Sequence, residues 1–203
     1  MKKIMGLLFT LLLITNTVFA FPNEPEGFRE LKWGDTIEKF TSYYPEAELL
    51  DTQKIKNDIS NEITISNIYG VKLKNRTLSN LKLDRRAIYF FNNKKFVGVV
   101  LSSIPMKSSF DFMEAEANFI ENLIYLYGNP TEKNYDFDST SSKKYTNYGW
   151  NSDNKSIILI KTEKSLLPNR DNRILIMIFD RTSIDILMNG SIDKKDTIKN
   201  QGW

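Results

Sequence analysis

The sequence predicts an α+β protein with a mostly antiparallel sheet and two helices packed on one side of it. Runs of apolar, β-branched and aromatic residues follow one another with short turns, which favours antiparallel pairing. Two segments carry helix start and stop signals. In both places the helix is followed by several strands, so a tandem of two α-then-β units is the simplest architecture that fits.

The N-terminus has the features of a secretory signal peptide. Lys2 and Lys3 precede an apolar run over 4–14, and small residues flank Phe19 at the expected cleavage site after Ala20. The apolar run is about half of the roughly 20 residues that an uncleaved membrane anchor needs. We therefore expect 1–20 to be removed and the protein to be exported, to the periplasm or, as the alternative, to the extracellular space.

Removal of this segment changes the charge of the chain. The basic count falls from 28 to 26 against 25 acidic residues, so the net charge falls from +3 to +1. Nucleic acid would require a concentrated basic stripe, and the cations here are interleaved with acids, so we expect no nucleic-acid partner. No later segment is long and apolar enough to span a membrane, so no transmembrane segment is expected after cleavage.

The first predicted elements lie close to the cleavage site. The alternation over 28–33 predicts a strand. Asp35, with Glu38 three residues on, predicts the N-cap of a helix over 36–44, and Pro45 ends it.

The rest of the first half is predicted to be a run of strands. Strands are expected over 47–51 and 62–69, separated by a polar loop over 53–61, whereas 70–80 is ambiguous. The clearest hairpin joins 81–91 to 95–103 through a turn at Asn92 and Asn93.

The second half opens with a long helix. Ser108 or Ser109 caps it, it runs to Tyr127, and Gly128 stands where a C-terminal glycine belongs, with Pro130 after it. A polar loop over 129–142 and three strands over 143–150, 155–162 and 173–181 follow. We expect one domain over 21–188, with possible halves 28–104 and 105–188, and a polar, disordered tail over 189–203.

Glu116 is the weak candidate for a catalytic group. At 100° per residue it falls inside the apolar arc of the long helix, between Phe112 and Ile120. A carboxylate that faces a core must be paired or become neutral. We expect a structural partner such as Arg85, Arg86 or a tyrosine; the alternatives are a rim position in water or a functional acid in a cleft.

Several strands are apolar on both faces, which a sheet covered on one side does not require. The segments are 87–91, 96–101, 157–160 and 174–179. Either both faces are covered or one face binds a partner. Tyr145, Tyr148 and Trp150 are candidate binding residues on such a face, because tyrosine and tryptophan are common at interface hot spots.

The chain contains no histidine and no cysteine. These absences exclude a Ser-His-Asp triad, a cysteine nucleophile, the usual zinc sites, a disulfide framework and a lipid anchor on cysteine. With no phosphate-binding glycine loop and no dinucleotide fingerprint either, we expect no metal, no cofactor and no catalytic residue other than the weak candidate Glu116.

Two stretches resemble small exported bacterial proteins of unknown function. They are the opening 27–38, in which Gly27-Phe28 and Trp33-Gly34 lead into a short helix, and the helix end Leu126-Tyr127-Gly128-Asn129-Pro130-Thr131 before a strand that ends at Trp150. The order of a helix, a glycine or proline that ends it, and an antiparallel sheet is similar to that in the β-lactamase-inhibitor-protein-like superfamily. This superfamily includes small lipoproteins of outer-membrane assembly. The resemblance implies a binding or scaffold role without catalysis.

The sequence thus leads to an exported protein that binds another protein or a cell-envelope component through a sheet face. Two alternatives stay open: a structural envelope protein with no discrete site, and a carboxylate-dependent hydrolase of envelope glycans. The hydrolase would pair Glu116 with a second carboxyl group about 5–10 Å away.

Overall fold

The computed structural model describes residues 23–57, 63–152, 156–182 and 190–192. The predicted signal peptide and most of the predicted tail lie outside these residues. The elements are β1 (Gly27–Phe28), β2 (Leu31–Lys32), α2 (Ile37–Tyr43), β3 (Glu48–Asn57), β4 (Ile63–Lys72), β5 (Thr77–Leu78), β6 (Leu81–Lys82), β7 (Arg86–Asn92), β8 (Lys95–Ser102), α3 (Ser109–Tyr127), β9 (Glu132–Asp138), β10 (Lys143–Asn151), β11 (Ser156–Ser165), β12 (Arg173–Asp180) and β13 (Gly190–Ile192).

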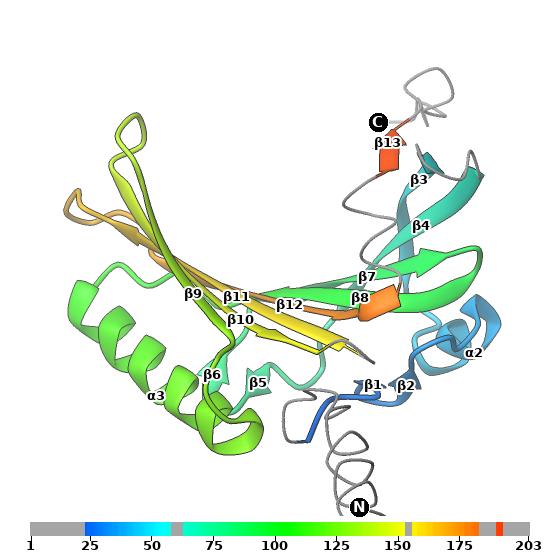
Figure 1. The fold of residues 1–203 in the computed structure, drawn as a ribbon, viewed down its shortest axis with the longest axis horizontal. Coiled ribbons are helices and arrows are strands. Elements are labelled where there is room, and N and C mark those ends of the chain that lie inside the picture. The colour runs from blue at the N-terminus through cyan, green and yellow to red at the C-terminus, as the bar shows by residue number, and fades with distance from the viewer. Residues whose placement is uncertain (1–22, 58–62, 153–155, 183–189, 193–203) are drawn as a thin grey trace, which may run out of the picture.

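One large antiparallel sheet organises the molecule (Figure 1). Its strand order is β13-β3-β4-β7-β8-β12-β11-β10-β9, and two small hairpins, β1-β2 and β5-β6, stand apart from it. The two ends of the sheet rise on the side away from α3, so that this side is concave (Figure 1). The predicted α+β class with a mostly antiparallel sheet and two helices is confirmed.

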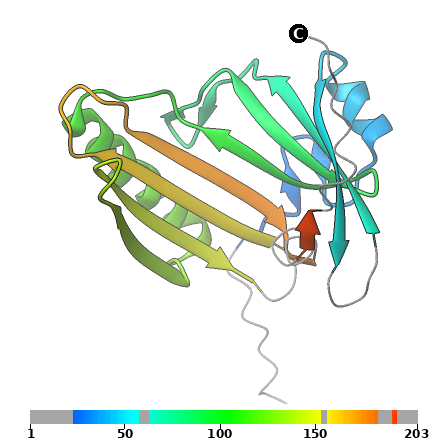
Figure 2. The same ribbon diagram turned by 90° about the horizontal axis from the view of Figure 1, so that it is seen from above.

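The main core lies between the sheet and the two helices. Phe40 of α2 is fully buried, with its ring 5.2 Å from that of Tyr89 and 4.9 Å from that of Phe91. Phe112 and Phe119 of α3 belong to the same core. Figure 2 shows α3 and α2 at opposite ends of the sheet.

The chain runs through the sheet in two successive meanders. The first places β3, β4, β7 and β8 side by side after α2, and the second places β9, β10, β11 and β12 side by side after α3. The last strand of each meander lies at the centre, where β8 pairs with β12. Four residues connect each helix to its first strand.

Two predictions near the N-terminus are wrong in detail. The expected strand 28–33 is the tight hairpin β1-β2, because Arg29 adopts a left-handed φ of 54° and turns the chain back. The N-cap of α2 is Thr36, whose Oγ1 accepts a hydrogen bond from the Lys39 amide at 3.3 Å. Asp35 instead accepts from the Lys32 amide.

Two predicted loops contain strands. β3 continues to Asn57 through the expected loop 53–61, and β9 occupies 132–138 of the expected loop 129–142. Both strands lie at or next to an edge of the sheet, where few side chains are buried. Their sequences are therefore polar and lack the apolar pattern that predicts a strand. Polar residues on β9 remain exposed over almost its whole length.

The expected strand over 81–91 is two strands, because β6 pairs with β5 in a separate hairpin and only β7 pairs with β8. The other elements lie where the sequence places them. The β7-β8 hairpin turns at Asn93 and Lys94, both with positive φ, one residue later than expected. Ser108 caps α3 and Gly128 ends it with a φ of 77°. Within the predicted tail, 190–192 forms β13 and pairs with β3.

Candidate functional site

The three predicted binding residues of β10 do not share one surface. Side chains alternate along a strand, so an odd separation places Tyr145 and Tyr148 on opposite faces. Trp150 lies on the helix side, fully buried, and its Nε1 donates to the Gly128 carbonyl at 2.8 Å. It fastens the end of α3 to the sheet and is not available to a partner. Tyr145 lies on the concave side, where the Lys161 ammonium sits 4.2 Å from its ring centre.

Tyr148 and Glu116 do meet. The Glu116 Oε1 accepts hydrogen bonds from the Thr162 Oγ1 at 3.0 Å and from the Tyr148 hydroxyl at 3.4 Å. Burial, and then the nearby Glu116 charge, raise the pKa of Tyr148. Glu116 is therefore a paired carboxylate at the edge of the core, and one of the expected partner types, a tyrosine, is present.

Glu116 lies at the bottom of a groove between α3 and strands β9, β10 and β11. The groove has a volume of about 690 Å³. Its lining is Glu116, Tyr135, Asp136, Phe137, Lys144, Tyr145, Thr146, Thr162 and Lys164. The side chain of Asp136 alternates to the concave side, opposite Tyr145, and its Oδ1 accepts a hydrogen bond from the Phe137 amide. The two carboxylates therefore lie on opposite faces of the sheet and do not flank a common site, as a glycoside hydrolase requires.

The concave face carries a row of apolar side chains across the centre of the sheet. Ile88 pairs with Val100, Val100 with Met177, and Met177 with Leu159. All four are partly exposed. Glycines end the row on both sides, because Gly70 pairs with Ile88 and Gly149 pairs with Leu159. We call the set Ile88, Val100, Met177 and Leu159 the central row.

A second set of side chains supports the central row. Phe90, Phe179 and Ile157 follow one another on the same face, with Phe179 and Ile157 nearly buried. The rings of Phe90 and Phe179 lie 5.5 Å apart. This small cluster contains residues of β7, β8, β11 and β12 and none of α2 or α3. It is a separate apolar layer on the face of the sheet opposite α3.

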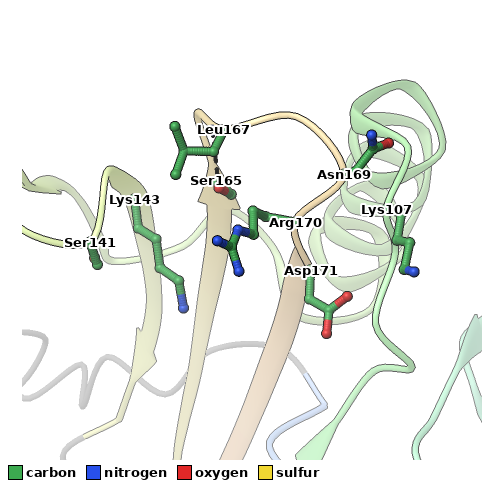
Figure 3. Close-up of a pocket in the computed structure, with 8 residues that line it drawn as sticks. All are labelled: Lys107, Ser141, Lys143, Ser165, Leu167, Asn169, Arg170 and Asp171. Atoms are coloured by element: carbon green, nitrogen blue, oxygen red, sulfur yellow. Dashed lines mark hydrogen bonds between the residues drawn. The ribbon is translucent and has the colours of Figure 1, made fainter.

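A third feature is the polar pocket at one end of the sheet (Figure 3). It has a volume of about 570 Å³, and Lys143 and Arg170 extend toward it from β10 and from the loop before β12 (Figure 3). Lys143 pairs with Glu163 at 3.3 Å, and Asp171 also lines the pocket. The lining thus carries three cations, Lys107, Lys143 and Arg170, against one carboxylate, Asp171.

Among the described residues no group of three or more acidic side chains could hold a metal ion. No described helix has the length and hydropathy needed to cross a membrane. The chain matches no family model, no curated protein and no solved structure.

The sequence signalled part of this arrangement. Strands that are apolar on both faces predicted a covered or binding face, and the central row is formed by those strands. Tyr135 and Phe137 of the groove were missed, because they fall in a segment predicted to be a loop. The alternation of Lys133, Tyr135 and Phe137 with acidic or amide residues was the signal that could have found them.

Proposed function

We propose that the protein is an exported, non-catalytic binding or scaffold module, which holds another protein or a cell-envelope component against the concave face of its sheet. The observation that carries the proposal is the central row. Four partly exposed apolar side chains stand in register on four adjacent strands, on the face of the sheet opposite α3. Contiguous exposed apolar patches mark interaction sites on soluble proteins.

The apolar centre is bordered by polar and charged side chains, including Lys161 and Glu163 on β11. An apolar centre with a polar rim is the usual anatomy of a protein interface.

We also propose that the fold is a tandem of two α-then-β units related by an approximate two-fold axis. Three features support it: the mirrored strand order about the β8-β12 pair, the equal helix-to-strand connections, and the central row itself. From the edge towards the centre of the sheet, the first unit contributes Gly70, Ile88 and Val100. The second unit contributes Gly149, Leu159 and Met177 in the same order.

The experiment compares two single variants of the exported chain. Met177→Lys places a charge in the central row, and the control Leu166→Lys places one at a leucine that is 49% exposed in the loop after β11. Partners are captured from an envelope extract, and hydrogen exchange of the bound protein locates the contact.

We expect Met177→Lys to reduce capture at least about tenfold, since a buried unpaired charge costs more than the 1.4 kcal/mol that a factor of ten represents. Leu166→Lys should capture as the parent does, and amides of β7, β8, β11 and β12 should be protected. Capture that survives Met177→Lys, or protection confined to other elements, would overturn the proposal.

A further inference from the structure

The helical layer of the protein is narrower than its sheet. α3 packs on β11 and β12, where Phe119 and Leu123 meet Ile158, Ile160 and Ile176. Packed helices stand 8–10 Å apart and neighbouring strands about 4.8 Å apart, so one helix covers about two strands. α3 also contacts the second half of β10 through Trp150 and Tyr148. The space beside the helix therefore lies over β9 and over the first half of β10, where Lys144 and Thr146 line the groove.

The side chains that face this space are large and exposed. Tyr135 is 72% exposed and Phe137 is 53% exposed, both on the helix side of β9. Met113 of α3 is 53% exposed, although the periodicity of the helix places it on the apolar arc, and its Sδ lies 3.2 Å from the ammonium of Lys164, which lines the groove. Aromatic and thioether groups on two facing walls are typical of a groove that receives an apolar helix face.

On the helix side of the groove the lysines outnumber the carboxylates. Lys144 and Lys164 line the groove, and Lys133 lies on the same side of the sheet beside Tyr135. Two carboxylates also line it: Glu116, which accepts hydrogen bonds from Thr162 and Tyr148, and Asp136, whose side chain alternates to the concave side. The Lys133 ammonium lies 5.4 Å from the ring centre of Tyr135 and 5.1 Å from that of Tyr148. A hydrogen bond to Tyr135 and the charge of Glu116 are among the causes that raise the pKa of Lys133 and keep it positive.

We propose that this groove binds an acidic amphipathic α-helix of a partner protein, laid beside α3 and over β9 and β10. The apolar stripe of that helix packs on Tyr135, Phe137 and Met113, and its flanking carboxylates pair with the three lysines. The site lies on the opposite side of the sheet from the central row, so it does not rest on the proposed function.

The probe is a synthetic helical peptide of about 18 residues, roughly the length of α3, with leucine at i, i+3, i+4 and i+7 and glutamate at most other positions. Two control peptides have the same length: a scrambled one that loses the apolar stripe, and one with lysine in place of glutamate. Binding to the full chain is followed by amide chemical shifts and by titration calorimetry.

We expect the acidic amphipathic peptide to shift amides of 133–137 and 144–148 and to bind at least about tenfold more tightly than either control. The variant Lys144→Glu/Lys164→Glu should weaken it by a further tenfold or more. The matched control Lys161→Glu reverses a lysine of the same sheet on the concave face and should leave the affinity unchanged.

Three results would overturn the proposal: equal binding of the scrambled or the basic peptide, shifts confined to the concave face, or no binding at millimolar peptide. A tighter complex of the groove with an acidic polysaccharide such as polygalacturonate would also overturn it, in favour of a glycan site. Met177→Lys should not change peptide binding, so failure here and failure of the concave-face proposal are distinguishable. Thermal unfolding of each variant confirms that it folds.

Discussion

The phenyl ring of Phe179 on β12 occupies the space directly above Gly98 on β8, where any Cβ would overlap it. The two residues are cross-strand partners at the centre of the sheet. Gly98 has no unusual backbone conformation. Its lack of a side chain is what allows the Phe179 ring to lie flat on the concave face and contact Phe90.

Replacing Gly98 by alanine should therefore destabilise the protein. The added methyl group forces Phe179 from its position, and overpacking of this kind costs about 1–3 kcal/mol in the free energy of unfolding. Urea denaturation measures it. Gly149→Ala is the control, because its Cβ would meet its nearest neighbours at 3.5 Å, an ordinary contact, and we expect a change within about 0.5 kcal/mol. Equal effects of the two changes would contradict this account of Gly98.

Trp150→Phe should loosen the end of α3. The substitution removes the hydrogen bond from Nε1 to the Gly128 carbonyl and leaves part of the buried ring volume empty. Together these losses should lower the free energy of unfolding by about 1–3 kcal/mol. Relative to the parent protein, the substitution should accelerate amide hydrogen exchange more in the last turn of α3 than in its first turn. Uniform acceleration along the helix would mean that Trp150 acts on the core alone.

Two substitutions measure separately what Thr162, the donor, and Glu116, the acceptor, contribute to the hydrogen bond between them. Thr162→Val removes a buried donor and should cost about 1–2 kcal/mol of unfolding free energy, because Thr162 is 2% exposed. Glu116→Gln keeps an acceptor and should change stability by less than about 0.5 kcal/mol. Capture of envelope partners by Glu116→Gln should equal that of the parent. Any glycan hydrolysis by the parent that Glu116→Gln abolishes would favour the hydrolase interpretation instead.

The carboxylate of Asp138, at the turn between β9 and β10, should become protonated only at unusually low pH. Hydrogen bonds from Ser141 and Thr140 lower the pKa of Asp138 from 3.8 to about 2. Since the pKa in the folded state is depressed, the stabilising contribution is present above pH 3.8 and is lost as the pH falls through about 2. Carboxyl carbon shifts in an NMR titration give this pKa directly. Ser141→Ala should move it upward; a titration of the parent near 3.8 would contradict the assigned bonds.

The sequence predicted elements wherever a side-chain pattern and a local stop signal agree. α3 is the clearest case, since Ser108, Gly128 and the apolar arc all mark the same helix. β9 was missed because an edge strand is hydrogen-bonded on one side and buries little, so its composition resembles that of a loop. The turn at Arg29 was missed because a non-glycine residue with positive φ has no reliable local signal.

The candidate surfaces depended on information that no local pattern contains. Apolar residues on both faces of β7, β8, β11 and β12 indicated a bare or covered second face. That Val100 stands opposite Met177, however, follows from the pairing of two strands separated by about 75 residues. Likewise, Glu116 was expected to have a partner, but the register of β10 and β11 selected Tyr148 and Thr162.

The central pairing of β8 with β12 also sets the order in which the protein can be completed. Until 173–180 has been synthesised, β8 has no partner on one edge, and that edge carries Val99, Val100 and Leu101. An apolar strand edge that waits for a distant segment is a site of aggregation. A chain truncated before β12 should therefore accumulate as insoluble material, and a chaperone that binds extended apolar segments should engage β8 during synthesis.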